Sequence, residues 1–176
     1  MTRPADDPQF FRSPPPPGRS RESTIRLDGE GHFQHDGDPF AHAKLASAMH
    51  KWIGRHPDDR RYILNNGYDW SYFTVEDAPY FVRHLVHAPE AAQRTAPVLS
   101  LSDETEEQLV AERTFVAPDG ALYTQIKREA PDGPYWAKFT RHAQTELAPY
   151  LTEVSGSPAL AFGGRVVTVG SRDVFE

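Results

Sequence analysis

The chain has 176 residues, of which 38% are hydrophobic and 11% aromatic, enough for one domain or two small ones around an apolar core. Its formal net charge is −6 and it has no block of Lys and Arg, which argues against nucleic acid or an anionic membrane as the main partner. The absence of cysteine excludes disulfides and thiolate metal sites and favours a cytoplasmic location, and no apolar run is typical of a signal peptide or a membrane span.

Residues 1–23 are predicted to form a disordered or extended proline-rich tail. The run Pro14–Pro17 favours polyproline II, and the polar residues that follow it favour flexible chain. A run of this kind is also typical of segments that dock on a protein partner.

A hairpin and a helix are predicted next. In residues 24–34, apolar side chains alternate with polar ones on either side of a turn at 28–31, which indicates two short strands. The pair Asp38–Pro39 predicts the start of a helix that ends near Ile53, because Asp is a good N-cap and Pro is favoured at the first helical position. Apolar residues at helical spacing support this helix: Leu45, Met49, Trp52 and Ile53.

The stretch from Arg61 to Val86 predicts the sheet on which this helix packs. Asn66–Gly67 lies between two β-rich runs and is typical of a two-residue hairpin turn, which would pair Asn65 with Tyr68. The predicted pairing places four side chains on one face: Ile63, Tyr68, Trp70 and Tyr72. Pro79 interrupts the ladder, and a further strand is expected from Tyr80 to Val82.

The second half repeats this kind of pattern. Its elements are expected in the order of a linker at 87–97, a strand at 97–102, an acidic turn at 103–107, a strand at 121–127, a helix from Pro134 to about Tyr150, and a hairpin of strands 159–162 and 165–169 around Gly163–Gly164.

The predicted fold class is α+β, with two tandem similar units that each consist of a small, mostly antiparallel sheet covered by one helix. The units span residues 24–88 and 97–170, and residues 171–176 form a C-terminal tail. Both predicted helices begin within an Asp-Gly-(Asp)-Pro-aromatic run, at residues 36–40 and 132–135. This shared order of elements indicates a structural duplication.

The stretch Val75–Val82, read as VEDAPYFV, resembles a motif of the DUF1285 family of bacterial proteins. The similarity extends over about residues 24–170 at the level of pattern. It includes Ile25–Gly29 with Asp38–Phe40, the acidic segment from Val98 to Glu112, the stretch from Tyr135 to Leu151, and Phe162–Arg165. The resemblance implies an α+β fold with two repeated motifs and a role in signalling, and it implies no known reaction. The chain departs from the family at Asn65–Gly67, where members tend to carry charged residues.

The predicted hairpin face is the best candidate for a ligand-binding site. Arg61, Tyr68, Trp70 and Tyr72 would form an aromatic floor with polar tips, a composition common at binding surfaces. The same composition is common where a helix covers a sheet, so the face could equally belong to the core.

No catalytic residue, cofactor or metal site is predicted. His32, His35, Asp36 and Asp38 have the residue types that bind metals, but their spacing puts the two histidines on opposite faces of a strand. The neighbouring carboxylates of Glu76 and Asp77 are likewise expected to point to opposite sides of an extended chain.

Three functions remain open from the sequence. The first is a non-enzymatic ligand-binding or regulatory module whose partner is a small molecule or a protein. The second is a hydrolase-type enzyme that brings His32 or His84 together with Asp69 or Asp77. The third is a structural interaction protein that docks through Pro14–Pro17. The sequence does not predict an oligomeric state.

Overall fold

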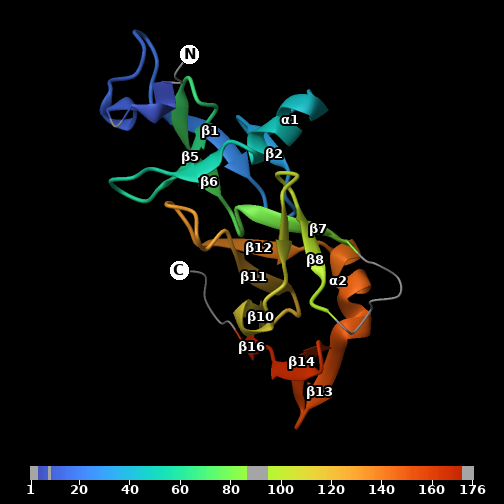
Figure 1. Cartoon of the computed structure of the whole chain (residues 1–176). Coiled ribbons are helices and arrows are strands. Elements are labelled where there is room, and N and C mark those ends of the chain that lie inside the picture. Colours follow the sequence, from blue (N-terminus) through green and yellow to red (C-terminus); the bar gives the residue numbers. More distant parts are fainter. Residues whose placement is uncertain (1–3, 8, 87–94, 172–176) are drawn as a thin grey trace. The chain divides into compact units, whose positions relative to one another are not determined.

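A computed structural model describes residues 4–7, 9–86 and 95–171 (Figure 1). The contacts between residues divide the chain into two compact units, Met1–Pro79 and Tyr80–Glu176, called unit 1 and unit 2. No helix in the described part of the chain is long and apolar enough to cross a membrane.

Unit 1 is built on one six-stranded sheet with the strand order β3-β2-β1-β6-β5-β4. The strands β1 and β6 are parallel, and the other neighbours are antiparallel. The elements are η1 (Pro4–Asp6), η2 (Phe10–Arg12), β1 (Glu22–Leu27), β2 (Phe33–His35), β3 (Asp38–Pro39), α1 (Ala43–His50), β4 (Ile53–Arg55), β5 (Tyr62–Asn65) and β6 (Trp70–Val75).

The first hairpin is confirmed, since β1 pairs with β2 and Leu27 lies opposite Phe33, but the predicted start of the helix at Asp38 is wrong. Asp36 and Gly37 have φ values of 54° and 87°, the left-handed pair that a two-residue hairpin turn requires. The chain therefore turns back, and Asp38 pairs with His35 in β3. The helix α1 begins later and is shorter than expected.

The hairpin around Asn66–Gly67 is confirmed, and its predicted register is wrong by two residues. Asn65 pairs with Trp70, which leaves a four-residue loop. The loop is held by the Asn66 side chain, whose Oδ1 accepts from the backbone N–H groups of Tyr68 and Asp69 at 2.9 Å each. Ile63 and Tyr72 still share a face, but Tyr68 leaves the strand and is 72% exposed.

Unit 2 contains a seven-stranded sheet with the order β16-β10-β11-β12-β7-β8-β9 and a three-stranded sheet with the order β13-β14-β15. Its elements are β7 (Tyr80–Val86), β8 (Val98–Leu101), β9 (Glu106–Gln108), η3 (Ala111–Arg113), β10 (Thr114–Val116), β11 (Leu122–Ile126), β12 (Tyr135–Phe139), α2 (Arg141–Leu147), η4 (Ala148–Tyr150), β13 (Leu151–Val154), β14 (Ser157–Phe162), β15 (Arg165–Thr168) and β16 (Gly170–Ser171). The predicted strands at 80–82, 97–102 and 121–127 are confirmed, as is the two-residue turn between Phe162 and Arg165.

The predicted helix from Pro134 to Tyr150 is wrong in its first half. Tyr135, Ala137 and Phe139 are buried in alternation with less buried neighbours, which is the period of a strand, and they form β12. The helix α2 begins after Thr140, whose Oγ1 accepts a hydrogen bond from the backbone N–H of Ala143 at 3.2 Å.

The α+β class is confirmed, but the predicted repetition of one β/α unit is not. The strand orders of the two large sheets differ, and the third sheet belongs to unit 2. The contacts place β7 in unit 2, whereas the sequence-based boundary at residue 88 placed it in the first unit. Most of the predicted linker lies outside the described residues.

Candidate functional site

A cavity of about 270 Å³ lies in unit 1. Its walls come from the segment that precedes β1, from β1, β5 and β6, from the loop between β5 and β6, and from α1 with the residues that flank it. The lining residues are Pro16, Arg19, Ser20, Arg21, Ile25, Phe40, Leu45, Met49, Trp52, Leu64, Asn66, Asp69, Trp70 and Ser71.

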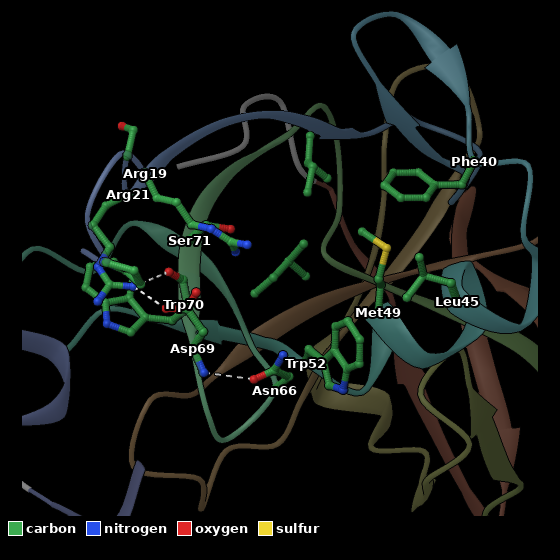
Figure 2. Close-up of a pocket in the computed structure, with 14 residues that line it drawn as sticks. Arg19, Arg21, Phe40, Leu45, Met49, Trp52, Asn66, Asp69, Trp70 and Ser71 are labelled. Atoms are coloured by element: carbon green, nitrogen blue, oxygen red, sulfur yellow. Dashed lines mark hydrogen bonds and ion pairs between the residues drawn. The ribbon is translucent and has the colours of Figure 1, made fainter. Parts of the chain in front are cut away.

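One wall of the cavity is apolar. Figure 2 shows Phe40, Leu45, Met49 and Trp52 gathered on one side of the cavity. Met49 is buried, while Leu45 is 38% exposed. A partly exposed Leu beside a cavity leaves apolar surface in contact with water, which an apolar ligand can cover.

The opposite wall is polar and cationic. The Arg21 guanidinium donates to Asp69 Oδ1 at 2.6 Å and to the Trp70 carbonyl at 2.7 Å, and it stacks on the Trp70 ring with its Cζ 4.4 Å from the centroid. Asp69 is thus neutralised by Arg21. Arg19 lies on the same side of the cavity (Figure 2), and its guanidinium forms no ion pair with the described residues. The wall therefore carries excess positive charge.

The parallel pairing of β1 and β6 positions the polar wall. Glu22 lies opposite Tyr72, and the Tyr72 backbone N–H donates to the Arg21 carbonyl at 2.7 Å. This places the segment that carries Arg19 and Arg21 against the start of β6, about 50 residues later in the chain.

Of the four residues predicted to bind a ligand, Trp70 lines this cavity and the other three do not. Arg61 and Tyr72 contact each other outside this cavity, with the Cζ atom of Arg61 3.7 Å from the Tyr72 ring centroid. The Arg61 guanidinium also donates two hydrogen bonds to Glu22, at 2.8 and 2.7 Å. Tyr68 instead borders a separate, more open depression of about 540 Å³ with Pro14–Pro17.

The N-terminal segment covers part of the predicted aromatic face. The Phe11 ring lies 6.0 Å from Trp70 and 5.9 Å from His56, and the Phe10 carbonyl accepts from Trp70 Nε1 at 3.4 Å. Arg12 pairs with Asp58 at 2.8 Å. The segment predicted to be a tail thus contributes to the core around Trp70.

Tyr72 has the largest shift in ionisation on this face. Burial raises the pKa of its phenol to about 12, and the hydrogen bond from its hydroxyl to Asp59 Oδ2, 2.8 Å long, acts in the same direction. The phenol is therefore a hydrogen-bond donor at neutral pH and does not act as a base.

His32 and His35 each lie beside a carboxylate that is near them in the sequence. His32 Nδ1 lies 3.6 Å from Asp28 Oδ2, and His35 Nδ1 lies 3.5 Å from Asp36 Oδ2. A different set of metal-binding residue types comes together in unit 2, where ligand atoms of His84, His142 and Glu146 lie within 4.8 Å of one another.

The sequence pattern predicts part of the cavity lining but not the cavity itself. Leu45, Met49 and Trp52 form an apolar stripe that predicts a helix packed on a sheet. Arg19 and Arg21 were assigned to the tail, and the signal that distinguishes them is an Arg pair directly before the first strand.

Comparison with solved structures shows two similar folds. A DUF1285 family protein from Silicibacter pomeroyi DSS-3 matches with a TM-score of 0.58 and 13% identity, over 85% of this chain and 80% of that chain. The chain has a DUF1285-like fold. A DUF1285 family protein from Shewanella baltica OS155 matches with a TM-score of 0.51 and 20% identity, over 69% of this chain and 87% of that chain. No family model and no curated protein matches the sequence.

The DUF1285-like fold agrees with the resemblance in the sequence around Val75–Val82. Neither of the two similar proteins is named for an activity, a ligand or a partner. The fold therefore assigns no reaction.

Proposed function

We propose that this protein is a ligand-binding module that holds a small amphipathic anion in the cavity of unit 1. The observation that carries the proposal is the opposition of two walls, apolar residues of α1 and its flanks on one side and Arg19 with Arg21 on the other. Ligand pockets typically combine an apolar lining with a few polar groups that fix the orientation of the ligand.

The size of the cavity limits the ligand. Its volume of about 270 Å³ is just below the range that is usual for pockets of drug-sized ligands, which suits a small organic acid. The apolar body of such a molecule would cover Leu45 and Trp52, which removes apolar surface from water.

The charge of the polar wall selects an anionic group. Asp69 is paired with Arg21 at 2.6 Å, so Arg19 supplies the uncompensated charge. A guanidinium binds a carboxylate through two parallel hydrogen bonds, which also fixes the orientation of the ligand. The Ser71 hydroxyl and the Asn66 amide line the same cavity as further hydrogen-bonding groups.

The test is a calorimetric titration of the full chain with a series of small carboxylates whose apolar part is aliphatic, phenyl or indole, each compared with its neutral amide. We expect carboxylates to bind more tightly than amides. Arg19→Gln should remove this preference, while Leu45→Ser should weaken both members of each pair.

Matched variants in unit 2 serve as controls. Arg128→Gln removes the same charge from an exposed site, and Leu151→Ser shortens a side chain that is 37% exposed, compared with 38% for Leu45. Neither control should change binding. Equal affinity for carboxylates and amides in the wild type, or equal effects of Arg19→Gln and Arg128→Gln, would contradict the proposal.

A further inference from the structure

The helix α2 is attached to β7 by hydrogen bonds at the point where β12 leaves the sheet. The last pair between β12 and β7 is Phe139 with Val82. Beyond it, the Thr140 backbone N–H donates to the Val82 carbonyl at 3.0 Å, and the Leu85 backbone N–H donates to Glu146 Oε2 at 2.7 Å. The helix thereby satisfies polar groups of β7 and is fixed relative to it.

An irregularity in β7 changes which of its side chains face outward at this point. The register of β7 with β8 shifts between Val82 and His84. Arg83 and His84 are consecutive and both exposed, whereas Val82 and Leu85 are buried. A β-bulge redirects side chains in this way and is common beside functional sites. His84 consequently lies on the side of the strand that α2 occupies, with its ring 5.1 Å from that of His142.

His142 and Glu146 lie one helical turn apart on α2, and their side chains approach each other. His142 Nε2 is 3.2 Å from Glu146 Oε1. The other carboxylate oxygen, Oε2, is held by the Leu85 N–H, so the carboxylate has a fixed orientation with Oε1 directed at the histidine. A carboxylate held by a second hydrogen bond is typical of a metal ligand supported by its outer shell.

We propose that His84, His142 and Glu146 form a binding site for a divalent transition-metal ion, with Zn²⁺ as the best fit. Two imidazoles and one carboxylate are a known ligand set for zinc. A tetrahedral zinc ion with bonds of about 2.0–2.1 Å holds its ligand atoms roughly 3.3 Å apart. The His142–Glu146 pair already has this spacing, at 3.2 Å, and ligand atoms of all three residues lie within 4.8 Å.

The site is accessible, and it would leave a coordination position for a further ligand. The side chains of His142 and Glu146 are 62% and 26% exposed, so an ion can enter from solvent and His84 can move towards it by side-chain rotation. Three protein ligands leave the fourth position of a tetrahedral ion to water or to another molecule. Binding would also connect β7 to α2 and stabilise unit 2 by mass action.

The experiment is a calorimetric titration in which ZnCl₂ is added to the full chain near neutral pH. Any purification tag is removed beforehand. The titration is combined with the visible absorption spectrum of bound Co²⁺ and with thermal unfolding in the presence and absence of Zn²⁺. We expect one ion per chain, a Co²⁺ spectrum of low coordination number, and a higher melting temperature with Zn²⁺. His84→Ala, His142→Ala and Glu146→Gln should each weaken binding by at least about tenfold, because even the loss of an outer-shell partner has an effect of that size.

Two controls separate a specific site from general binding to exposed histidines. His32→Ala and His35→Ala remove exposed imidazoles that also lie beside a carboxylate, and they should leave the affinity unchanged. Glu146→Gln keeps an oxygen that can accept a hydrogen bond from the Leu85 N–H, so this variant should keep the wild-type fold. Its far-UV circular dichroism spectrum checks this. An absence of Zn²⁺ binding, equal affinity in wild type and the three site variants, or equal loss in His35→Ala would overturn the proposal.

Discussion

At the scale of single residues, Tyr72 shows how a side chain predicted to bind a ligand is used within the protein itself. Its hydroxyl donates to Asp59, its ring lies under the Arg61 guanidinium, and its neighbour Trp70 is covered by Phe11. These contacts give the polar groups partners and cover the aromatic rings that favoured the prediction of a ligand-binding face. Any ligand of this face would have to compete with them, whereas the cavity beside it also contains Arg19, which forms no ion pair with the described residues.

The first prediction concerns the ionisation of Tyr72. The difference in phenolate absorbance between wild type and Tyr72→Phe, followed with pH, should show a midpoint at about 12 for Tyr72, above the ordinary value of 10.0. Burial is the main cause, and Asp59 adds to it. Asp59→Asn should therefore lower the midpoint towards 10. A comparison with Tyr72→Phe is needed because burial also raises the pKa of Tyr150.

The same shift in the pKa of Tyr72 predicts a dependence of stability on pH. Because the folded protein retains this proton more tightly than the unfolded chain, the contribution of Tyr72 to stability is fully present below about pH 10. It decreases as the pH rises from there to about 12, where the folded state also ionises. Urea unfolding of wild type and Tyr72→Phe at increasing alkaline pH measures this difference. A Tyr72 midpoint near 10 in the folded protein would refute both expectations.

At the scale of elements, the sequence predicted those turns whose geometry depends on adjacent residues. Gly163–Gly164 gave a two-residue turn, and Asn66–Gly67 lies in a hairpin. The register at Asn66 was missed because its side chain accepts two backbone hydrogen bonds and stabilises a longer loop. Asp36–Gly37 precedes an Asp-Pro pair that favours the start of a helix, but its two left-handed residues form a turn.

The cavity could not be predicted from local pattern, because its two walls are distant in sequence. Arg19 and Met49 line the same cavity from opposite sides, and the Arg19 side is held in place by the parallel pairing of β1 with β6, which no periodicity in either segment reveals. The stretch around Phe139 shows a second limit. A strand and a helix follow each other there, and their apolar residues together imitate one long helical stripe.

The second prediction uses the different N-caps of the two helices. The Thr140 side chain caps α2, whereas His42 at the N-cap of α1 makes no side-chain capping bond. His42 has extended backbone angles of −102° and 98°, which suit a capping residue. His42→Ser should therefore stabilise the protein by about 1 kcal/mol, and Thr140→Ala should destabilise it by about the same amount.

Urea unfolding of the full chain measures both changes. His42→Ala is the control, because it removes the imidazole without supplying an acceptor for the first backbone N–H groups of α1. If His42→Ser and His42→Ala have equal stability, the gain does not come from capping and the prediction fails.

At the scale of the whole molecule, the pairing of strands follows the division into two units. The six strands of the first sheet all belong to residues 1–79, and the strands of the other two sheets all belong to residues 80–176. Each unit also has its own buried residues, among them Leu27, Ile63 and Phe73 in unit 1 and Val82, Ile126 and Leu147 in unit 2. No described strand pair would be broken by cutting the chain after Pro79.

The third prediction is that residues 1–79 and residues 80–176 each fold when expressed alone. The first fragment is near the size at which a single core becomes marginal, so we expect it to be the less stable of the two. The overlay of amide NMR spectra of each fragment on the spectrum of the full chain tests this, since most resonances away from the cut should coincide.

The two fragments also separate the two proposed sites. Residues 1–79 contain every residue that lines the cavity, and residues 80–176 contain His84, His142 and Glu146. The first fragment should therefore retain the preference for carboxylates and the second should retain Zn²⁺ binding. Two unfolded fragments from a chain that folds when intact would show that each unit needs the other for stability. In that case the division seen in strand pairing would not correspond to a division in folding.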